Sequence, residues 1–212
     1  MSGLGDKFGA FPVMAILRGL QPDSAVETGR LLIENGIGAL EVPLNRPGAV
    51  ESIAILAKHF GAEAAVGAGT VISEDQVLKI GQAGATFAVS PHTDPVVIAA
   101  TKEAGLLSIP GVATPTEAYL AIRSGADFLK IFPCDHLVPA AVRAVSAILP
   151  EGTPLLCVGG IDETNIAAFL DAGASGFGIG SALYRPGMTA HDVSTKIAEL
   201  REAAERPNQV SN

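Results

Sequence analysis

Cysteine is scarce in this sequence, and long apolar runs are absent. The two cysteines, Cys134 and Cys157, lie far apart and form no Cys-x-x-Cys motif, so a disulfide framework is not indicated. No stretch reaches the roughly 18 uninterrupted apolar residues that a transmembrane helix needs. The first eight residues contain Asp6 and Lys7 and no long apolar core, so we expect no signal peptide. These features predict a cytoplasmic protein that has no membrane partner.

Lysine and arginine are also in short supply. The chain has 14 of them against 22 aspartates and glutamates, which gives a net charge of −8. Nucleic-acid binding needs clustered basic side chains to neutralise phosphates, so we expect no nucleic-acid partner. A small anionic substrate is still compatible with this balance, because a local basic site can exist inside an acidic protein. With 48% hydrophobic and 17% charged residues, the chain can bury a large core and is not expected to be disordered.

Histidine shows no spacing typical of metal ligands. The four histidines, His59, His92, His136 and His191, are scattered, so we expect no metal site. His92 follows Ser90 and Pro91 after an apolar run and is a candidate for the mouth of a site. Cys134 follows Pro133 and is interpreted as a small spectator rather than a nucleophile.

What the sequence does contain is a repeated alternation of short apolar runs and longer, alanine-rich amphipathic segments. Each run is too short for a helix and lacks polar alternation, which is typical of strands buried on both faces of a parallel sheet. The runs are Val13–Leu17, Ala39–Leu44, Ala64–Ala68, Phe87–Val89, Leu106–Ile109, Phe128–Phe132, Leu155–Val158 and Phe177–Ile179. The expected helices include Asp23–Glu34, Pro47–His59, Ser73–Ala83, Asp94–Ala104, Pro115–Ser124, Pro139–Ile148 and Glu163–Ala172.

Helix boundaries are marked by capping residues and glycines. Start signals stand at Pro22-Asp23-Ser24, Ser73-Glu74-Asp75, Thr114-Pro115 and Asp162-Glu163. A glycine, which provides a left-handed C-cap, follows the helical segment at Gly36, Gly84, Gly105, Gly125 and Gly173. About eight such units predict a single-domain α/β protein, a (β/α)8 TIM barrel with short loops. An open doubly wound sheet is the alternative, but no Gly-x-Gly-x-x-Gly motif follows the first run.

We expect one barrel domain over residues 1–212. Within it, residues 1–12 form an N-terminal segment that includes a short helix closing the bottom of the barrel. Residues 206–212 are polar and are expected to form a frayed tail.

Lys130 is the one lysine inside a strand-like run. A buried lysine is costly unless it is paired or used, because desolvation disfavours its charge and lowers its pKa. A partly neutral amine is what Schiff-base chemistry requires. The alternative is an edge-strand lysine whose ammonium reaches water.

Glu41 is the matching exception among the carboxylates, since it also lies within an apolar run. Gly36 precedes Glu41 by five positions, as Gly125 precedes Lys130, and the two runs are the second and sixth along the chain. Alternate strands fill the same layer of a barrel, so both side chains should point inward at similar height. Glu41 is therefore either a general acid/base or half of a structural ion pair with Lys130.

Other polar residues fall where strands are expected to end, which is where barrel enzymes work. Arg18 could hold a carboxylate or phosphate, or could pair with Glu41. Thr70 follows a glycine-rich strand that either leaves room for a ligand or only permits tight packing. Glycines follow the last two expected strands, and glycine lets backbone N–H groups approach a phosphate closely. These residues are Gly159, Gly160 and Gly180, with Ser181 after the last of them.

These residues belong to motifs that resemble a known family. From about residue 13 to 200, the sequence is similar to the 2-keto-3-deoxy-6-phosphogluconate and 2-keto-3-deoxy-6-phosphogalactonate aldolases, small class I (Schiff-base) enzymes. The motifs are Ala15-Ile16-Leu17-Arg18-Gly19, Glu41-Val42-Pro43-Leu44-Asn45, Gly67-Ala68-Gly69-Thr70-Val71, Ser90-Pro91, Pro110-Gly111, Leu129-Lys130-Ile131-Phe132-Pro133, Val158-Gly159-Gly160 and Gly180-Ser181.

The resemblance implies Lys130 as the Schiff-base lysine and Glu41 as the proton shuttle. It also implies keto-acid contacts from Arg18 and Thr70 and phosphate contacts around Gly159, Gly160, Gly180 and Ser181. Family members are typically homotrimers, use no metal and no cofactor, and act on a phosphorylated keto sugar acid.

Two positions resemble the galactonate branch of the family. Gluconate-type enzymes usually have Thr-Leu-Arg where this chain has Pro43-Leu44-Asn45, and a threonine where it has Val158. We therefore expect cleavage of 2-dehydro-3-deoxy-6-phosphogalactonate to pyruvate and glyceraldehyde 3-phosphate. The gluconate epimer, or both epimers, is the alternative substrate. A phosphosugar isomerase or epimerase and an inactive ligand-binding barrel are more remote alternatives.

Overall fold

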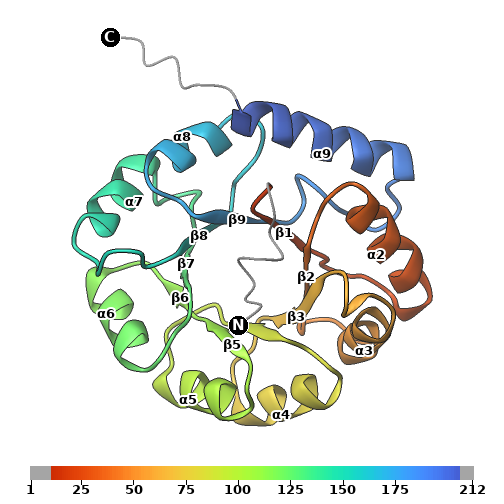
Figure 1. Cartoon of the computed structure of the whole chain (residues 1–212), viewed down its shortest axis with the longest axis horizontal. Coiled ribbons are helices and arrows are strands. Elements are labelled where there is room, and N and C mark those ends of the chain that lie inside the picture. Colours follow the sequence, from red (N-terminus) through yellow and green to blue (C-terminus); the bar gives the residue numbers. More distant parts are fainter. Residues whose placement is uncertain (1–10, 206–212) are drawn as a thin grey trace.

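Parallel strands form the wall of a barrel in the computed structural model, which describes residues 11–205 (Figure 1). Their order around the sheet is β5-β4-β3-β2-β1-β9-β8-β7-β6, and every pairing is parallel. The strands are β1 (Val13–Ile16), β2 (Ala39–Pro43), β3 (Ala65–Gly69), β4 (Phe87–Val89), β5 (Leu107–Ile109), β6 (Gly111–Val112), β7 (Leu129–Ile131), β8 (Leu155–Val158) and β9 (Gly176–Ile179). The predicted TIM barrel is confirmed, and the open doubly wound sheet is excluded.

The fifth strand differs from the prediction, because it is split in two. β5 and β6 are the two ends of the sheet order, and one residue, Pro110, separates them in the chain. Proline has no N–H to donate to a ladder, so the regular pairing stops there. Its carbonyl still accepts a hydrogen bond from the N–H of Lys130 at 2.9 Å. The barrel therefore closes at Pro110, directly beside the strand that contains Lys130.

Helices surround the strands on the outside (Figure 1). They are the short 3-10 helix η1 (Pro22–Ser24) and the helices α2 (Ala25–Glu34), α3 (Ala49–Phe60), α4 (Glu74–Gln82), α5 (Pro95–Glu103), α6 (Pro115–Arg123), α7 (Pro139–Ser146), α8 (Ile166–Asp171) and α9 (Ala190–Glu205). The predicted start signals at Ser73 and Thr114 are confirmed, since both side chains cap the helix that follows. The five predicted C-cap glycines all have positive φ, from 74° to 102°.

The predicted start of α8 at Asp162-Glu163 is wrong. The Asp162 carboxylate accepts hydrogen bonds from the backbone N–H and the hydroxyl of Thr164, which closes a local turn. An aspartate satisfies such a turn as readily as a helix N-terminus. The helix consequently begins four residues later, at Ile166, with Asn165 before it.

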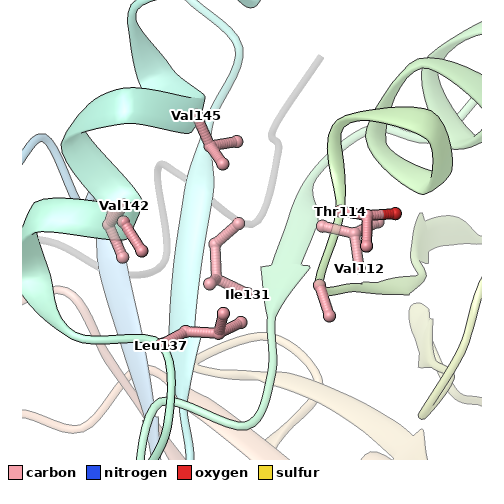
Figure 2. A pocket seen from close by; sticks show the side chains of 8 residues that line it. Val112, Thr114, Ile131, Leu137, Val142 and Val145 are labelled. Carbon is pink, nitrogen blue, oxygen red and sulfur yellow. The ribbon is translucent and has the colours of Figure 1, made fainter.

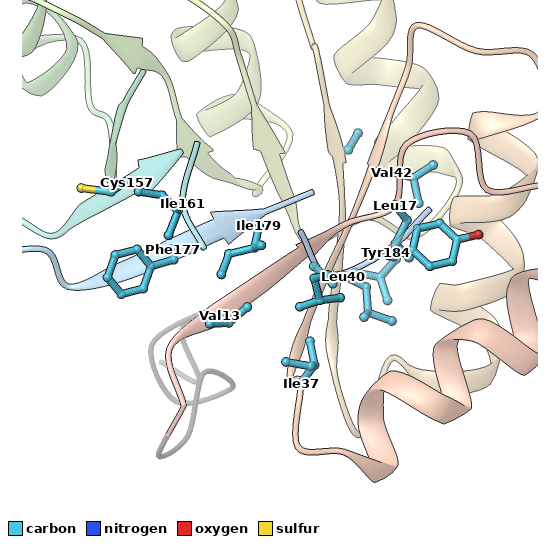
Figure 3. Close-up of a cluster of buried hydrophobic side chains, with 14 of the residues drawn as sticks. Val13, Leu17, Ile37, Leu40, Val42, Cys157, Ile161, Phe177, Ile179 and Tyr184 are labelled. Carbon is cyan, nitrogen blue, oxygen red and sulfur yellow. The ribbon is translucent and has the colours of Figure 1, made fainter. Parts of the chain in front are cut away.

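Side chains alternate between two apolar layers along each strand. One layer lies between the strands and the helices and includes the buried residues drawn in Figure 3, among them Val13, Leu40 and Phe177. The other lies inside the barrel and contains Met14, Ala39, Ala65, Phe87, Val89, Ile109 and Leu156. Because side chains two positions apart share a face, Glu41 follows Ala39 into the barrel interior. Lys130 follows Phe128, which packs against the same inner cluster.

Some predictions concern the ends of the chain. Residues 1–10, with most of the predicted N-terminal segment and its bottom helix, and the predicted tail at residues 206–212 lie outside the described residues. Between residues 11 and 205, no helix combines the length and apolar character that crossing a membrane requires.

A small apolar cavity of about 40 Å³ lies between α7 and the strands beneath it (Figure 2). Ile131 of β7, Val112 of β6 and the α7 residues Val142 and Val145 line it. Val142 is fully buried, so its side chain already contributes to the layer between helix and sheet. Unfilled space of this size forfeits dispersion contacts.

We expect Val142→Ile to fill part of this cavity and to raise the free energy of unfolding by about 0.5 kcal/mol. Val142→Ala should lower it by about 2 kcal/mol, since it enlarges the same space. Urea denaturation at pH 7 measures both. A Val142→Ile variant less stable than the wild type would mean that the cavity cannot accept another methylene.

Candidate active site

Lys130 and Glu41 are buried inside the barrel, on strands that lie apart in the sheet. Lys130 is the middle residue of β7 and is 8% exposed, while Glu41 is the middle residue of β2 and is 3% exposed. β7 pairs with β6 on one side and β8 on the other, so Lys130 is not an edge-strand lysine. Each side chain lies within electrostatic reach of the other, as the sequence predicted for the two walls.

The Glu41 carboxyl group is held where ionisation is unfavourable. Burial raises its pKa to about 7, although the positive charges of Lys130 and Arg18 act in the opposite direction. Its Oε2 atom is buried and accepts no hydrogen bond from residues 11–205. A Cβ atom on Gly69 would collide with this carboxylate. The glycine therefore provides the space that Glu41 itself occupies, which favours tight packing, the second of the two interpretations of the glycine-rich strand.

Burial also lowers the pKa of the Lys130 amine, and the positive charge of Arg18 adds to the lowering. The negative charge of Glu41 opposes it. Nζ lies 4.5 Å from the centroid of the Phe132 ring, which can stabilise the ammonium form through its face. A desolvated lysine of this kind has a larger neutral fraction near pH 7 than an exposed one.

The alternative interpretations of Glu41 and Arg18 as ion-pair partners are wrong for this structure. The Glu41 carboxylate forms no ion pair with Lys130 or with Arg18. The three groups influence one another's charge without being locked in a salt bridge. This leaves the Lys130 amine and one carboxylate oxygen free to act on a bound molecule.

A large cavity of about 950 Å³ opens above this pair, at the carboxyl ends of β1, β8 and β9. Five of the predicted site residues line it, namely Arg18, Gly159, Gly160, Gly180 and Ser181. Lys130, Glu41 and Thr70 do not line it. Phe132, which contacts the Lys130 amine, and Ile16, which pairs with Glu41 in the sheet, form part of its wall. The cavity thus adjoins the buried pair through these two neighbours.

The cavity is also lined by two arginines that the sequence analysis did not identify, Arg46 and Arg185. Both are exposed, and like Arg18 they form no ion pair with any described residue. One carboxylate, that of Asp162, lines the same cavity and accepts hydrogen bonds from Thr164. In a protein of net charge −8, this concentration of unpaired arginine favours an anionic ligand. Their position in the sequence could have identified them, because each arginine follows the carboxyl end of a strand, β2 or β9, by a few residues.

The glycine-rich loops after β8 and β9 have the open backbone that an anion site needs. Gly159 and Gly160 have φ angles of +97° and +67°, a region that side-chain-bearing residues rarely adopt. The N–H groups of Gly160 and Ile161 donate to no acceptor within residues 11–205. After β9, the Gly180 carbonyl accepts from the N–H groups of Leu183 and Tyr184, which starts a turn at Ser181.

Thr70 stands at the end of β3 in a strained conformation. Its φ of +58° makes it the one non-glycine residue with positive φ among residues 11–205. Such outliers cost about 1–3 kcal/mol and cluster at functional sites. The adjacent Gly69 is the residue that makes room for Glu41, so the strain occurs beside the buried carboxylate.

The remaining candidates lie outside the site. His92 is exposed, sits 4.0 Å from Asp94 and does not line the cavity. Cys134 and Cys157 are distant in sequence, both are buried free cysteines, and the Cys134 thiol donates a hydrogen bond to the Ile131 carbonyl at 3.3 Å. No group of three or more His, Cys, Asp or Glu side chains able to hold a metal occurs in the described part of the chain.

Comparison with known proteins places the chain in a family. A family model described as KDPG and KHG aldolase matches residues 5–200. The sequence is similar to a probable 2-dehydro-3-deoxy-6-phosphogalactonate aldolase of Rhizobium meliloti (strain 1021), with 43% identity over 89% of this chain and 90% of the relative. It is also similar to the 2-dehydro-3-deoxy-6-phosphogalactonate aldolase of Escherichia coli (strain K12), with 38% identity over 92% of this chain and 97% of the relative.

The structural comparison agrees with the sequence comparison. A solved structure of native KDPGal superimposes with a TM-score of 0.88 and 37% identity, covering 92% of this chain and 94% of the other. The resemblance first seen in separate motifs therefore extends over almost the whole barrel. The chain belongs to the KDPG and KHG aldolase family, whose members are class I, Schiff-base-forming lyases.

Proposed function

We propose that this protein cleaves 2-dehydro-3-deoxy-6-phosphogalactonate to pyruvate and glyceraldehyde 3-phosphate through a Schiff base on Lys130. One observation carries the proposal. An amine of lowered pKa and a carboxyl of raised pKa share the barrel interior without forming an ion pair. A nucleophilic amine and a nearby group able to exchange protons near pH 7 are what aldol cleavage by a class I enzyme requires.

The neutral Lys130 amine attacks the C2 ketone of the substrate, and loss of water gives an iminium ion. Glu41, directly or through a water molecule, then removes the proton of the C4 hydroxyl. The C3–C4 bond breaks, glyceraldehyde 3-phosphate leaves, and the bonding electrons move into the iminium to form an enamine. Protonation at C3 and hydrolysis release pyruvate and restore the amine. The covalent intermediate divides one difficult step into several easier ones.

The two anionic ends of the substrate are assigned to different parts of the site. Arg18 and Thr70 hold the keto-acid end, next to the buried pair. The phosphate binds the backbone at Gly159 and Gly160, together with Gly180 and Ser181. The unpaired charges of the two arginines found in the cavity wall, Arg46 and Arg185, support binding of a substrate with this much negative charge. Fixing both ends supplies the orientation that bond cleavage needs.

The galactonate epimer is the proposed substrate because Val158 lines the cavity. A valine cannot hydrogen-bond a substrate hydroxyl, whereas the gluconate-type enzymes have a threonine at the position that the resemblance assigns to it. Asn45 likewise replaces the arginine of the gluconate pattern. The names of the two curated relatives support the same choice.

Residence in the cytoplasm and assembly as a homotrimer are also part of the proposal. The free state of both cysteines supports a reducing compartment. Membership of the family supports the trimer, and the match over residues 5–200 supports one domain over residues 1–212. All three stay predictions.

We expect borohydride reduction in the presence of pyruvate to leave a pyruvate-sized adduct on Lys130, detectable by peptide mass spectrometry. Lys130→Met should abolish both the adduct and cleavage. Lys79→Met, which removes an exposed lysine of α4, is the matched control and should retain both. An adduct on any other lysine would refute the assignment.

The raised pKa of Glu41 predicts the pH dependence of cleavage. A base must be ionised to accept a proton, so kcat/KM should rise as the pH increases through about 7. Glu41→Gln should lower kcat by about 10²–10⁴-fold and remove this inflection. Glu51→Gln, an exposed substitution on α3, should leave the profile unchanged.

The raised pKa of Glu41 also predicts that the stability of the folded protein falls as the pH rises, while activity increases. A carboxyl whose pKa is higher in the folded state destabilises the protein progressively between its unfolded value of 4.5 and about 7. Glu41→Gln should therefore gain up to about 3 kcal/mol of stability relative to the wild type between pH 4.5 and pH 8. A gain that does not change with pH in urea denaturation would contradict the titration of Glu41 in this range.

We expect Val158→Thr to shift the ratio of kcat/KM values for the galactonate and gluconate epimers toward gluconate by about tenfold. Threonine matches valine in shape, so the added hydroxyl is the main change. Val158→Ala removes bulk without adding a hydroxyl and should not produce this shift. An unchanged ratio in Val158→Thr would show that this position does not read the C4 hydroxyl.

A further inference from the structure

The loop between β8 and α8 is held by one side chain, that of Asn165. Its Nδ2 donates to the carbonyl of Gly160 at 2.6 Å, and its Oδ1 accepts from the N–H of Asp162 at 3.1 Å. Both groups belong to backbone that lines the large cavity. A single amide thus fixes the peptide planes on the two sides of Ile161.

The geometry of the peptide bond gives this contact a consequence for the cavity. The C=O and N–H of a trans peptide point in opposite directions. When Asn165 holds the Gly160 carbonyl, the N–H of Ile161 points the other way, and this N–H has no acceptor within residues 11–205. An N–H held free in this way is suited to receive an anion.

The loop would not keep this shape unaided. Gly159 and Gly160 both have positive φ angles, and glycine reaches other conformations at little cost. If the Gly160 peptide rotated, its carbonyl oxygen could face the cavity and repel an anion there. The hydrogen bond from Asn165 opposes that rotation.

Asn165 does not serve α8 in the usual manner. It precedes the helix at the N-cap position, yet its side chain makes no capping hydrogen bond to that helix. Helix capping is the ordinary reason for asparagine at this position. Here both ends of the amide are committed to the loop, so the side chain stabilises the cavity backbone rather than the helix.

We propose that Asn165 is a positioning residue for the substrate phosphate, which acts by fixing the Gly160 peptide so that the N–H of Ile161 faces the anion. The inference rests on the proposed function for the identity of the anion. Asn165 itself does not contact the reacting atoms. Asp162 lines the same wall, and its Oδ1 atom accepts two hydrogen bonds from Thr164.

Two substitutions separate this role from general destabilisation. Asn165→Leu keeps a similar volume and removes both hydrogen bonds, while Asn165→Asp keeps the acceptor for Asp162 and loses the donor to Gly160. Asn35→Leu is the matched control, because the Asn35 amide also donates to a backbone carbonyl, that of Leu31, at the end of α2. Asn35 lies outside the proposed site.

For both Asn165 variants we expect KM for the phosphorylated substrate to rise about tenfold, with kcat reduced by less than about threefold. The dissociation constant of glycerol 3-phosphate, measured by calorimetry, should rise by a similar factor. The rate of borohydride trapping with pyruvate, which has no phosphate, should stay unchanged. Asn35→Leu should behave as the wild type in all three measurements.

Unchanged KM and glycerol 3-phosphate affinity in the variants would overturn the inference. A parallel loss of pyruvate trapping and of phosphate affinity would also overturn it, since that pattern indicates a merely structural role. Failure of the wild type to trap pyruvate would instead overturn the proposed function. The glycerol 3-phosphate measurement would then still decide whether Asn165 shapes an anion site.

Discussion

Desolvation of two opposite charges inside one barrel is the constraint on which this site depends. Glu41 and Lys130 lie within each other's field, yet they form no ion pair, so neither is neutralised by direct contact. Burial then moves both pKa values toward neutrality, the carboxyl upward and the amine downward. An ion pair at contact distance would favour the charged forms and make both groups poorer at exchanging protons near pH 7. The distance between the strands that contain them is therefore part of the chemistry.

The surrounding backbone maintains that arrangement. Gly69 leaves the space that the carboxylate fills, and Pro110 interrupts the strand next to Lys130 while its carbonyl still anchors the lysine backbone. Gly67 is similarly required, because a Cβ atom there would collide with the ring of Phe87 below the site. Small residues near the mouth and large ones beneath them thus divide the barrel into an open top and a filled base.

Much of this was predictable, because strands buried on both faces and helices that end in glycine leave strong local signals. All eight apolar runs became strands, and Lys130 and Glu41 stood out as charges in apolar runs. The break at Pro110 was missed although the proline itself was a visible signal. The late start of α8 was missed because it depends on the hydrogen bonds of Asp162, which spacing alone does not reveal. Arg46 and Arg185 were missed because they lie in loops, where an arginine is ordinarily a solvated surface residue.

The site therefore combines two kinds of order. The buried pair is fixed by packing, which the sequence pattern determines, whereas the glycine-rich loop after β8, the proposed phosphate site, is held by the two hydrogen bonds of the Asn165 amide. Val158 lies at the junction, as the last residue of β8 before the two glycines. Val158 lines the cavity but belongs neither to the buried pair nor to the two glycines of the loop. This separation explains how one barrel can keep its bond-breaking chemistry while its preference among substrate epimers changes.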